Sequence, residues 1–141
     1  MSAIEKNCVV VPVDFGELSL TAIATALEYV KSPNQIHAVH ILEALQATDP
    51  AMIWNTLDDE VRKNNAHKKL EEVLNQPEHQ GIQIYVEIGH PSEKIVDFSQ
   101  EKNADLIVIP THGRRGISRF MLGSVTERVI RFAQCPVLVL R

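Results

Sequence analysis

The segment ADLIVIPTHGRRGISRFMLGSVTERVIRFAQCPVLVLR, residues 104–141, contains the pattern that decides the fold. Two short apolar runs rich in β-branched residues, Leu106–Ile109 and Val137–Leu140, lie near its two ends. Between them, apolar residues recur at helical spacing from Val125 to Phe132, and this pattern stops before a proline. A strand, a helix and a strand in this order predict a parallel βαβ unit with a right-handed crossover.

The rest of the chain repeats the same alternation. The run Cys8–Val13 is apolar throughout and Ile36–Leu42 is apolar apart from two histidines, which is typical of strands covered on both faces. The run Ile82–Ile88 alternates apolar and polar residues, which indicates a strand at the edge of the sheet. Helical patterns separate the strands, and they cover Leu20–Val30, Ala66–Leu74 and a segment that begins at Pro91. We therefore predict an α/β fold, with residues 1–141 forming a single domain around a doubly wound, five-stranded parallel sheet with helices on both faces.

The bulk composition limits the class of protein. Of the 141 residues, 45% are apolar and 23% are charged, and the net charge is −4. An acidic chain does not favour a nucleic-acid partner. No apolar run approaches the roughly 18 residues of a membrane helix, and the opening residues MSAIEKN lack the apolar core of a signal peptide. Cys8 and Cys135 match no metal or redox motif, and each adjoins an apolar run, so we expect buried thiols in a reduced, cytoplasmic protein.

Ligands of doubly wound sheets bind beyond the carboxyl ends of the strands, so the residues that follow each strand are the first candidates for a site. Asp14 follows the opening strand. Its carboxylate is placed to meet ribose hydroxyls or a phosphate-bound metal, but an aspartate at this point also serves to cap a turn or the next helix. Both interpretations of Asp14 remain open from the sequence.

A glycine-rich loop follows the strand at 106–109. Gly113, Gly116 and Gly123 allow the backbone to bend and to approach a ligand closely, and His112 lies where it could reach a phosphate. The sequence Ser124–Glu127 reads S-x-x-E, a capping box that predicts a helix beginning at Ser124. The free N–H groups and the positive dipole end of such a helix favour an anion. A capping box, however, needs no ligand to explain it.

Other familiar sites are missing from the sequence. Neither the GxxxxGK[ST] loop nor a GxGxxG fingerprint after the first strand is present. The remaining histidines, His37 and His40 among them, do not form a spaced ligand set, so each is expected to be packed or solvated. We assign no catalytic residue and no metal ligand.

The quoted segment, together with VVVPVDFGELSLTAIATALEYV near the start and IHAVHILE in the next strand, resembles the universal stress protein family. The resemblance covers nearly the whole chain and is weakest from about Gln46 to Gln80. It implies a Rossmann-like domain with strand order 3-2-1-4-5, and a homodimer formed through the last strand, Pro136–Leu140. An unpaired apolar edge strand is a physical reason for such pairing.

One branch of that family binds ATP through the motif G-x2-G-x9-G-[ST]. By resemblance, Gly113 is the second glycine of the motif, residues 114–122 follow, and Gly123 and Ser124 complete it. Phosphates would lie at these positions, the adenosine beside Val13 and Asp14, and the adenine between Ile41 and Ile109. The complete set of expected nucleotide-binding residues is Pro12, Val13, Asp14, Ile41, Ile109, Thr111, His112, Gly113, Gly123, Ser124 and Val125. The implied ligand is ATP, or another adenine nucleotide, with Mg²⁺.

The first glycine of the motif is replaced by Pro110. Proline has no N–H, so any ligand contact made by the backbone amide at this point is lost. The loss of one neutral hydrogen bond costs about 1 kcal/mol, or roughly fivefold in affinity. The start of the following helix is unaffected, so we expect nucleotide binding to persist.

The residues and the family resemblance together are consistent with three functions. The first is a cytoplasmic, dimeric stress-response protein that binds an adenine nucleotide at residues 109–125 and signals to protein partners. The second is a nucleotide-free interaction module, which the proline at position 110 favours. The third is a slow ATP hydrolase or autophosphorylating enzyme, with Asp14 placing Mg²⁺ and with Ser124 and Thr126 as the nearest hydroxyls.

Overall fold

The computed structural model describes residues 4–44, 59–111 and 123–141 of the chain. Strands and helices alternate along it, with short 3₁₀ turns at Pro33–Gln35 and Pro77–His79. The elements in chain order are β1 (Val9–Pro12), α1 (Glu17–Leu27), β2 (Ile36–Leu42), α3 (Asp59–Val73), β3 (Gln83–Ile88), α4 (Pro91–Glu101), β4 (Leu106–Pro110), α5 (Ser124–Phe132) and β5 (Val137–Leu140). Within these described ranges, every helix is too short or too polar to span a bilayer.

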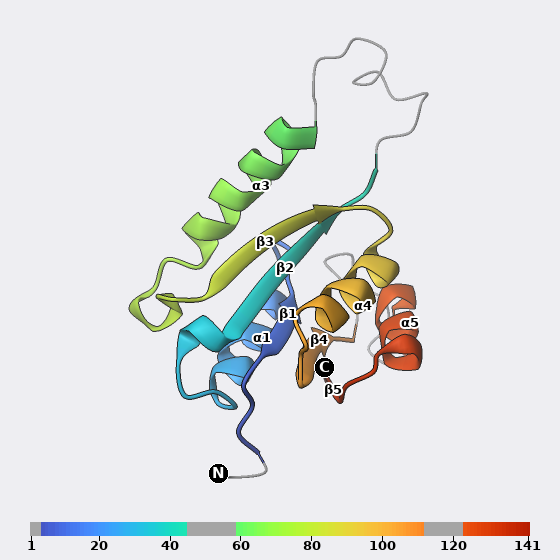
Figure 1. Ribbon diagram of the computed structural model, residues 1–141. Helices are drawn as coiled ribbons and strands as arrows, with labels where there is room; N and C mark the ends of the chain where they lie inside the picture. The colour runs from blue at the N-terminus through green and yellow to red at the C-terminus, as the bar shows by residue number, and fades with distance from the viewer. Residues whose placement is uncertain (1–3, 45–58, 112–122) are drawn as a thin grey trace.

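The five strands form one parallel sheet in the order β3-β2-β1-β4-β5 (Figure 1). This order confirms the predicted doubly wound, Rossmann-like fold. The strand β3 lies at one edge of the sheet, as its alternating sequence indicated, and β5 lies at the other. Between β1 and β4 the sequence direction reverses, so the connections that leave these two strands pass to opposite faces.

Helices cover both faces of the sheet. Val9 and Val11 of β1 point to the face covered by α1 and α3, and Val10 points to the face covered by α4 and α5. All three valines are fully buried. Consecutive side chains buried on both faces suit the centre of such a sheet, and each buried valine contributes about 1.5–3 kcal/mol of transfer free energy.

Two helical stripes differ from the predicted ones. In α1 the predicted stripe began at Leu20, but Leu20 is 40% exposed, while Ala22 and Ala26 are buried. Small side chains let the helix pack close to the sheet, which turns the larger leucine outward. In α5, Phe132 was predicted to lie on the buried face and is instead 55% exposed, because the helix ends there.

Small corrections apply to the ends of the elements and to the thiols. The first strand is shorter than the predicted Cys8–Val13, and the fourth extends by one residue to Pro110. Cys8 and Cys135 are half-buried rather than buried, because each precedes a strand at the amino-terminal end of the sheet. Burial raises the pKa of both thiols, and the Asp105 carboxylate raises them further.

Candidate functional site

A cleft of about 620 Å³ lies at the carboxyl ends of β1, β2 and β4, beside the start of α5. Its volume is in the range of small-molecule and cofactor sites. The residues that line it are Pro12, Val13, Asp14, Ser19, Val39, His40, Ile41, Glu43, Pro91, Ile95, Ile109, Pro110, Gly123, Ser124, Val125 and Thr126. The cleft therefore occupies the position where doubly wound sheets bind their ligands, at the reversal of strand order.

Most of the residues predicted for nucleotide binding meet in this cleft. Those that line it are Pro12, Val13, Asp14, Ile41, Ile109, Gly123, Ser124 and Val125. Thr111 lies next to it but is buried, with its amide bonded to the Leu140 carbonyl at 2.7 Å. His112 and Gly113 lie outside the described residues. No cluster of metal-ligating side chains occurs in the described parts of the chain.

The start of α5 differs from the predicted capping box. Gly123 is the N-cap residue, with φ −67° and ψ 154°, and no side chain caps the helix. The helix begins at Ser124, as predicted, but Ser124 is its first helical residue and is exposed. The prediction that the Ser124 side chain caps the helix is therefore wrong. Glu127, the other half of the predicted box, bonds to Arg131 at 3.1 Å.

Hydrogen bonds attach the start of α5 to the end of β4. The Gly123 amide donates to the Thr111 carbonyl at 2.7 Å, and the Thr126 hydroxyl donates to the Pro110 carbonyl at 2.8 Å. The first helical bond runs from the Glu127 amide to the Gly123 carbonyl. The amides of Ser124, Val125 and Thr126 form no hydrogen bond with any described residue, as expected for a first turn. These amides, together with the helix dipole, make an anion-binding surface.

Pro110 occupies the last position of β4 and lines the cleft. The amides of Ile107, near the start of the strand, and of Thr111, directly after it, face β5 and donate to the carbonyls of Pro136 and Leu140. Because successive amides of a strand point to opposite sides, an amide at position 110 would point towards β1 and the cleft. The proline therefore removes a donor from the cleft and leaves the pairing with β5 intact.

Asp14 forms the turn that begins α1. Its Oδ1 accepts from the Gly16 amide at 2.7 Å and from the Ser19 hydroxyl at 3.0 Å. The turn-forming interpretation is therefore confirmed. Its Oδ2 forms no hydrogen bond within the described parts of the chain. The carboxylate of Asp14 thus combines a structural role with a spare acceptor at the cleft.

Sequence reasoning missed the role of His40. Its Nδ1 lies 2.7 Å from the Val13 carbonyl oxygen, and its ring packs against Phe15 with centroids 4.9 Å apart. The position of His40, near the carboxyl end of its strand, could have indicated that it lies close to the ligand site. Ser19, Glu43, Pro91 and Ile95 were also missed. Ser19, Pro91 and Ile95 come from helices whose packing against the cleft the sequence does not reveal. Glu43 directly follows β2, so its position was an available signal.

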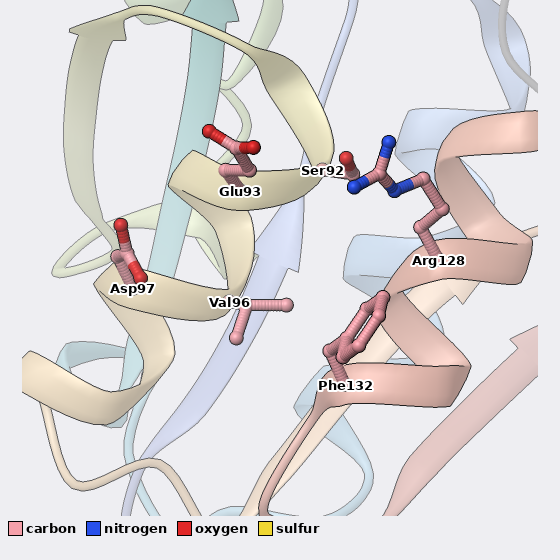
Figure 2. A pocket seen from close by; sticks show the side chains of 6 residues that line it. All are labelled: Ser92, Glu93, Val96, Asp97, Arg128 and Phe132. Carbon is pink, nitrogen blue, oxygen red and sulfur yellow. The ribbon is translucent and has the colours of Figure 1, made fainter.

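A smaller cavity of about 320 Å³ lies between α4 and α5. Its lining side chains, drawn in Figure 2, are Ser92, Glu93, Val96, Asp97, Arg128 and Phe132. Figure 2 shows the Ser92 side chain facing the Arg128 guanidinium across the gap between the helices. None of the residues predicted for nucleotide binding lines this cavity. The cleft at the end of the sheet, which most of the predicted residues line, is therefore the candidate nucleotide site.

Comparison with known proteins places this geometry in a family. The model of the universal stress protein family matches residues 7–141. The chain belongs to the universal stress protein family. It is 36% identical to the universal stress protein MJ0531 of Methanocaldococcus jannaschii over 137 residues, which cover 94% of this chain and 81% of that protein. It is 29% identical over 148 residues to the universal stress protein YxiE of Bacillus subtilis, covering 96% and 99% of the two chains.

Solved structures of the family share the fold. The structure of protein MJ0577 superposes with a TM-score of 0.74 at 24% identity, covering 95% of each chain. A universal stress protein solved in complex with cAMP has a TM-score of 0.65 at 22% identity, covering 96% of this chain and 97% of the other. These likenesses support the sheet topology described above.

Proposed function

We propose that this universal stress protein binds an adenine nucleotide, with Mg-ATP as the expected form, in the cleft at the carboxyl end of its sheet. The protein then acts as a cytoplasmic, homodimeric sensor that signals to protein partners. The observation that carries the proposal is the start of α5. Three amides at that end, of Ser124, Val125 and Thr126, lack a described acceptor and face a cleft of nucleotide size.

The two ends of the cleft suit the two ends of a nucleotide. Phosphates are stabilised by the amides of α5 and by its dipole, worth about 0.3–1 kcal/mol for an exposed anion and up to about 2 kcal/mol when partly buried. Ile41 and Ile109 line the cleft on the side of α4 and α5 and offer apolar surface to a base. Asp14 offers an acceptor to the sugar. The family member solved with cAMP supports the choice of an adenine nucleotide.

The last strand supplies the surface for a homodimer. Strand β5 lies at an edge of the sheet, and all four of its residues, Val137–Leu140, are half-buried. An apolar edge strand with unused backbone groups favours pairing with another strand. A second copy of the same strand meets this requirement through a two-fold axis.

Two observations bear on the alternatives. Pro110 removes a donor from the cleft, which favours a nucleotide-free interaction module. The Thr126 hydroxyl is buried and already donates to the Pro110 carbonyl, so it is a poor phosphate acceptor. Ser124 is exposed at the cleft, which leaves it as the hydroxyl for slow autophosphorylation.

Calorimetric titration with Mg-ATP, after removal and identification of any bound nucleotide, tests the proposal. We expect the wild type to bind and Pro110→Gly to bind about fivefold more tightly, because the variant regains one amide donor. Pro77→Gly, which alters a proline in a 3₁₀ turn away from the cleft, serves as the control. Binding by Pro110→Gly alone would favour the interaction module, and no binding by either protein would refute nucleotide sensing.

A further inference from the structure

The peptide group between Val13 and Asp14 is held from both sides by side chains of other elements. Its carbonyl lies 2.7 Å from Nδ1 of His40, which comes from β2. Its amide donates to the hydroxyl oxygen of Ser19, which comes from α1, at 2.7 Å. The Val13 amide also donates to the Val39 carbonyl at 2.9 Å. The backbone at the end of β1 therefore has its orientation fixed at the point where it enters the cleft.

The contact with His40 defines the state of that side chain. A carbonyl oxygen only accepts, so the Nδ1 of His40 carries the proton and donates. The tilted ring contact with Phe15 at 4.9 Å limits rotation of the imidazole. The His40 side chain is thus a fixed donor aimed at the end of a neighbouring strand.

Ser19 acts on the carboxylate of Asp14 as well as on its backbone. The Ser19 side chain is buried, and its hydroxyl accepts from the Asp14 amide and donates to Asp14 Oδ1. The Gly16 amide donates to the same Oδ1. With Oδ1 engaged twice, the carboxylate cannot turn without breaking hydrogen bonds, so Oδ2 has a preset direction. Oδ2 has no hydrogen-bond partner among the residues that the structure describes.

We propose that Ser19 and His40 are positioning residues that hold Asp14 so that its Oδ2 accepts a hydrogen bond from one ribose hydroxyl of the bound nucleotide. This inference rests on the proposed nucleotide function. It makes the site selective for ribonucleotides, because a ligand without that hydroxyl leaves a desolvated carboxylate oxygen unpaired. It also separates the roles of the three residues, since Asp14 touches the ligand and the other two act through it.

The test compares the affinities of ATP, 2′-deoxy-ATP and 3′-deoxy-ATP, all as magnesium complexes, by calorimetry. For the wild type, we expect the deoxy analogue that lacks the accepted hydroxyl to bind about tenfold more weakly than ATP, the factor for one hydrogen bond to a charged group. We expect this ratio to fall to about twofold or less in two variants. Ser19→Ala removes one of the two hydrogen bonds to Asp14 Oδ1, and His40→Leu removes the donor that fixes the Val13–Asp14 peptide, so in each case Oδ2 loses its preset direction.

Matched variants separate positioning from general loss of structure. His40→Asn has the same branched skeleton of side-chain heavy atoms as His40→Leu but keeps a donor near the position of Nδ1, so it should restore most of the ratio. Ser99→Ala removes another buried helical serine, whose hydroxyl bonds to the Val96 carbonyl at 2.7 Å away from the cleft, and should leave the ratio unchanged. Thermal unfolding establishes which variants are folded.

The outcomes distinguish the two proposals. A wild type that binds ATP and both deoxy analogues equally, or folded Ser19→Ala and His40→Leu variants that keep the full ratio, would overturn the positioning role and leave nucleotide binding standing. A wild type that binds none of the three nucleotides would overturn the nucleotide function and this inference with it. A ratio that falls in both variants and returns in His40→Asn supports the inference.

Discussion

Two aspartates lie at opposite ends of the neighbouring strands β1 and β4, and they use their carboxylates differently. Asp105, at the amino-terminal end, accepts from the Asn7 amide at 2.9 Å with Oδ2 and from the Cys8 amide at 3.1 Å with Oδ1. Asp14, at the carboxyl end, has both of its described side-chain bonds on Oδ1. Both carboxylate oxygens of Asp105 therefore bond to backbone amides at one end of the sheet, whereas Asp14 keeps one oxygen available as an acceptor at the other end.

The pairing of the strands explains this difference. At the amino-terminal end the sheet is continuous, since the Asp105 amide bonds to the Cys8 carbonyl and the Ile107 amide to the Pro136 carbonyl. Towards the other end β1 and β4 separate, because their pairing stops at Val10 and Ile107, whereas β1 pairs with β2 along its whole length. The cleft opens where the pairing stops. We therefore expect changes at the carboxyl end to affect ligand binding and changes at the amino-terminal end to affect stability.

The largest effect on binding is expected from Gly123→Asp. The new carboxylate would lie at the start of α5 and repel phosphates, at a cost of about 3–4 kcal/mol for close like charges near a surface, or at least a hundredfold in affinity for Mg-ATP. Asp is also a favourable N-cap residue, so the helix itself should not be weakened. Calorimetric titration measures the loss. Unchanged affinity would exclude the α5 end as the phosphate site.

Asp105→Ala should give the largest effect on stability without changing the affinity for ATP. It leaves the amides of Asn7 and Cys8 without their acceptor, and we expect the free energy of unfolding to fall by about 2 kcal/mol. Urea unfolding gives the value. Asp97→Ala, which removes a carboxylate from α4, is the matched control and should change stability by less than about 0.5 kcal/mol. Weakened ATP binding in Asp105→Ala would contradict the separation of the two ends.

Asp14→Asn tests the carboxyl end with a smaller change. The amide retains one oxygen for the turn and replaces the other acceptor with a donor, so we expect about tenfold weaker ATP binding with little loss of stability. Titration and urea unfolding together check both halves of this prediction. A large loss of stability with unchanged affinity would make Asp14 a purely structural residue, like Asp105.

The smallest effect concerns the thiols at the amino-terminal end. Burial, and after it the Asp105 carboxylate, raises the pKa of Cys8 and Cys135 above the ordinary value of 9.0. Because the folded state disfavours the thiolates, their contribution to stability is complete below pH 9.0 and is lost as the pH rises through the raised values. Unfolding measured at pH 8 and pH 10 should show a smaller alkaline loss in the Cys8→Ala/Cys135→Ala variant. An equal loss would exclude the thiols as the cause.

The sequence predicted the strands correctly, because the pattern of buried apolar residues identifies them. Predominantly apolar runs marked the three central strands, and the alternation from Ile82 to Ile88 marked an edge strand. The run Val137–Leu140 is also apolar but lies at the other edge, where it is only half-buried. Strand order came from the family resemblance, because local patterns do not define which strands are neighbours. Of the predicted α1 stripe only Leu20 was misplaced, because the small residues Ala22 and Ala26 are buried beside Ile23 while Leu20 is exposed.

The candidate site was predicted in part. Asp14 and the start of α5 were found by the rule that ligands bind beyond the carboxyl ends of strands, whereas Val13, Ile41 and Ile109 were implied by the family resemblance. Ser124 was assigned the wrong local role because Gly123 takes the N-cap position, which the S-x-x-E pattern does not reveal. His40 was missed because it bonds to Val13, which follows a different strand. Ser19 was missed because its bonds to Asp14 depend on the turn between β1 and α1.

The central claim is that nucleotide binds at the carboxyl end of the sheet and not at the amino-terminal end. An amide NMR titration with Mg-ATP tests it in one measurement. We predict that the amide resonances of Asp14, Ser124 and Val125 shift with added nucleotide, while those of Asn7, Cys8 and Asp105 do not. Shifts confined to the amino-terminal end, or no shifts at millimolar nucleotide, would contradict it.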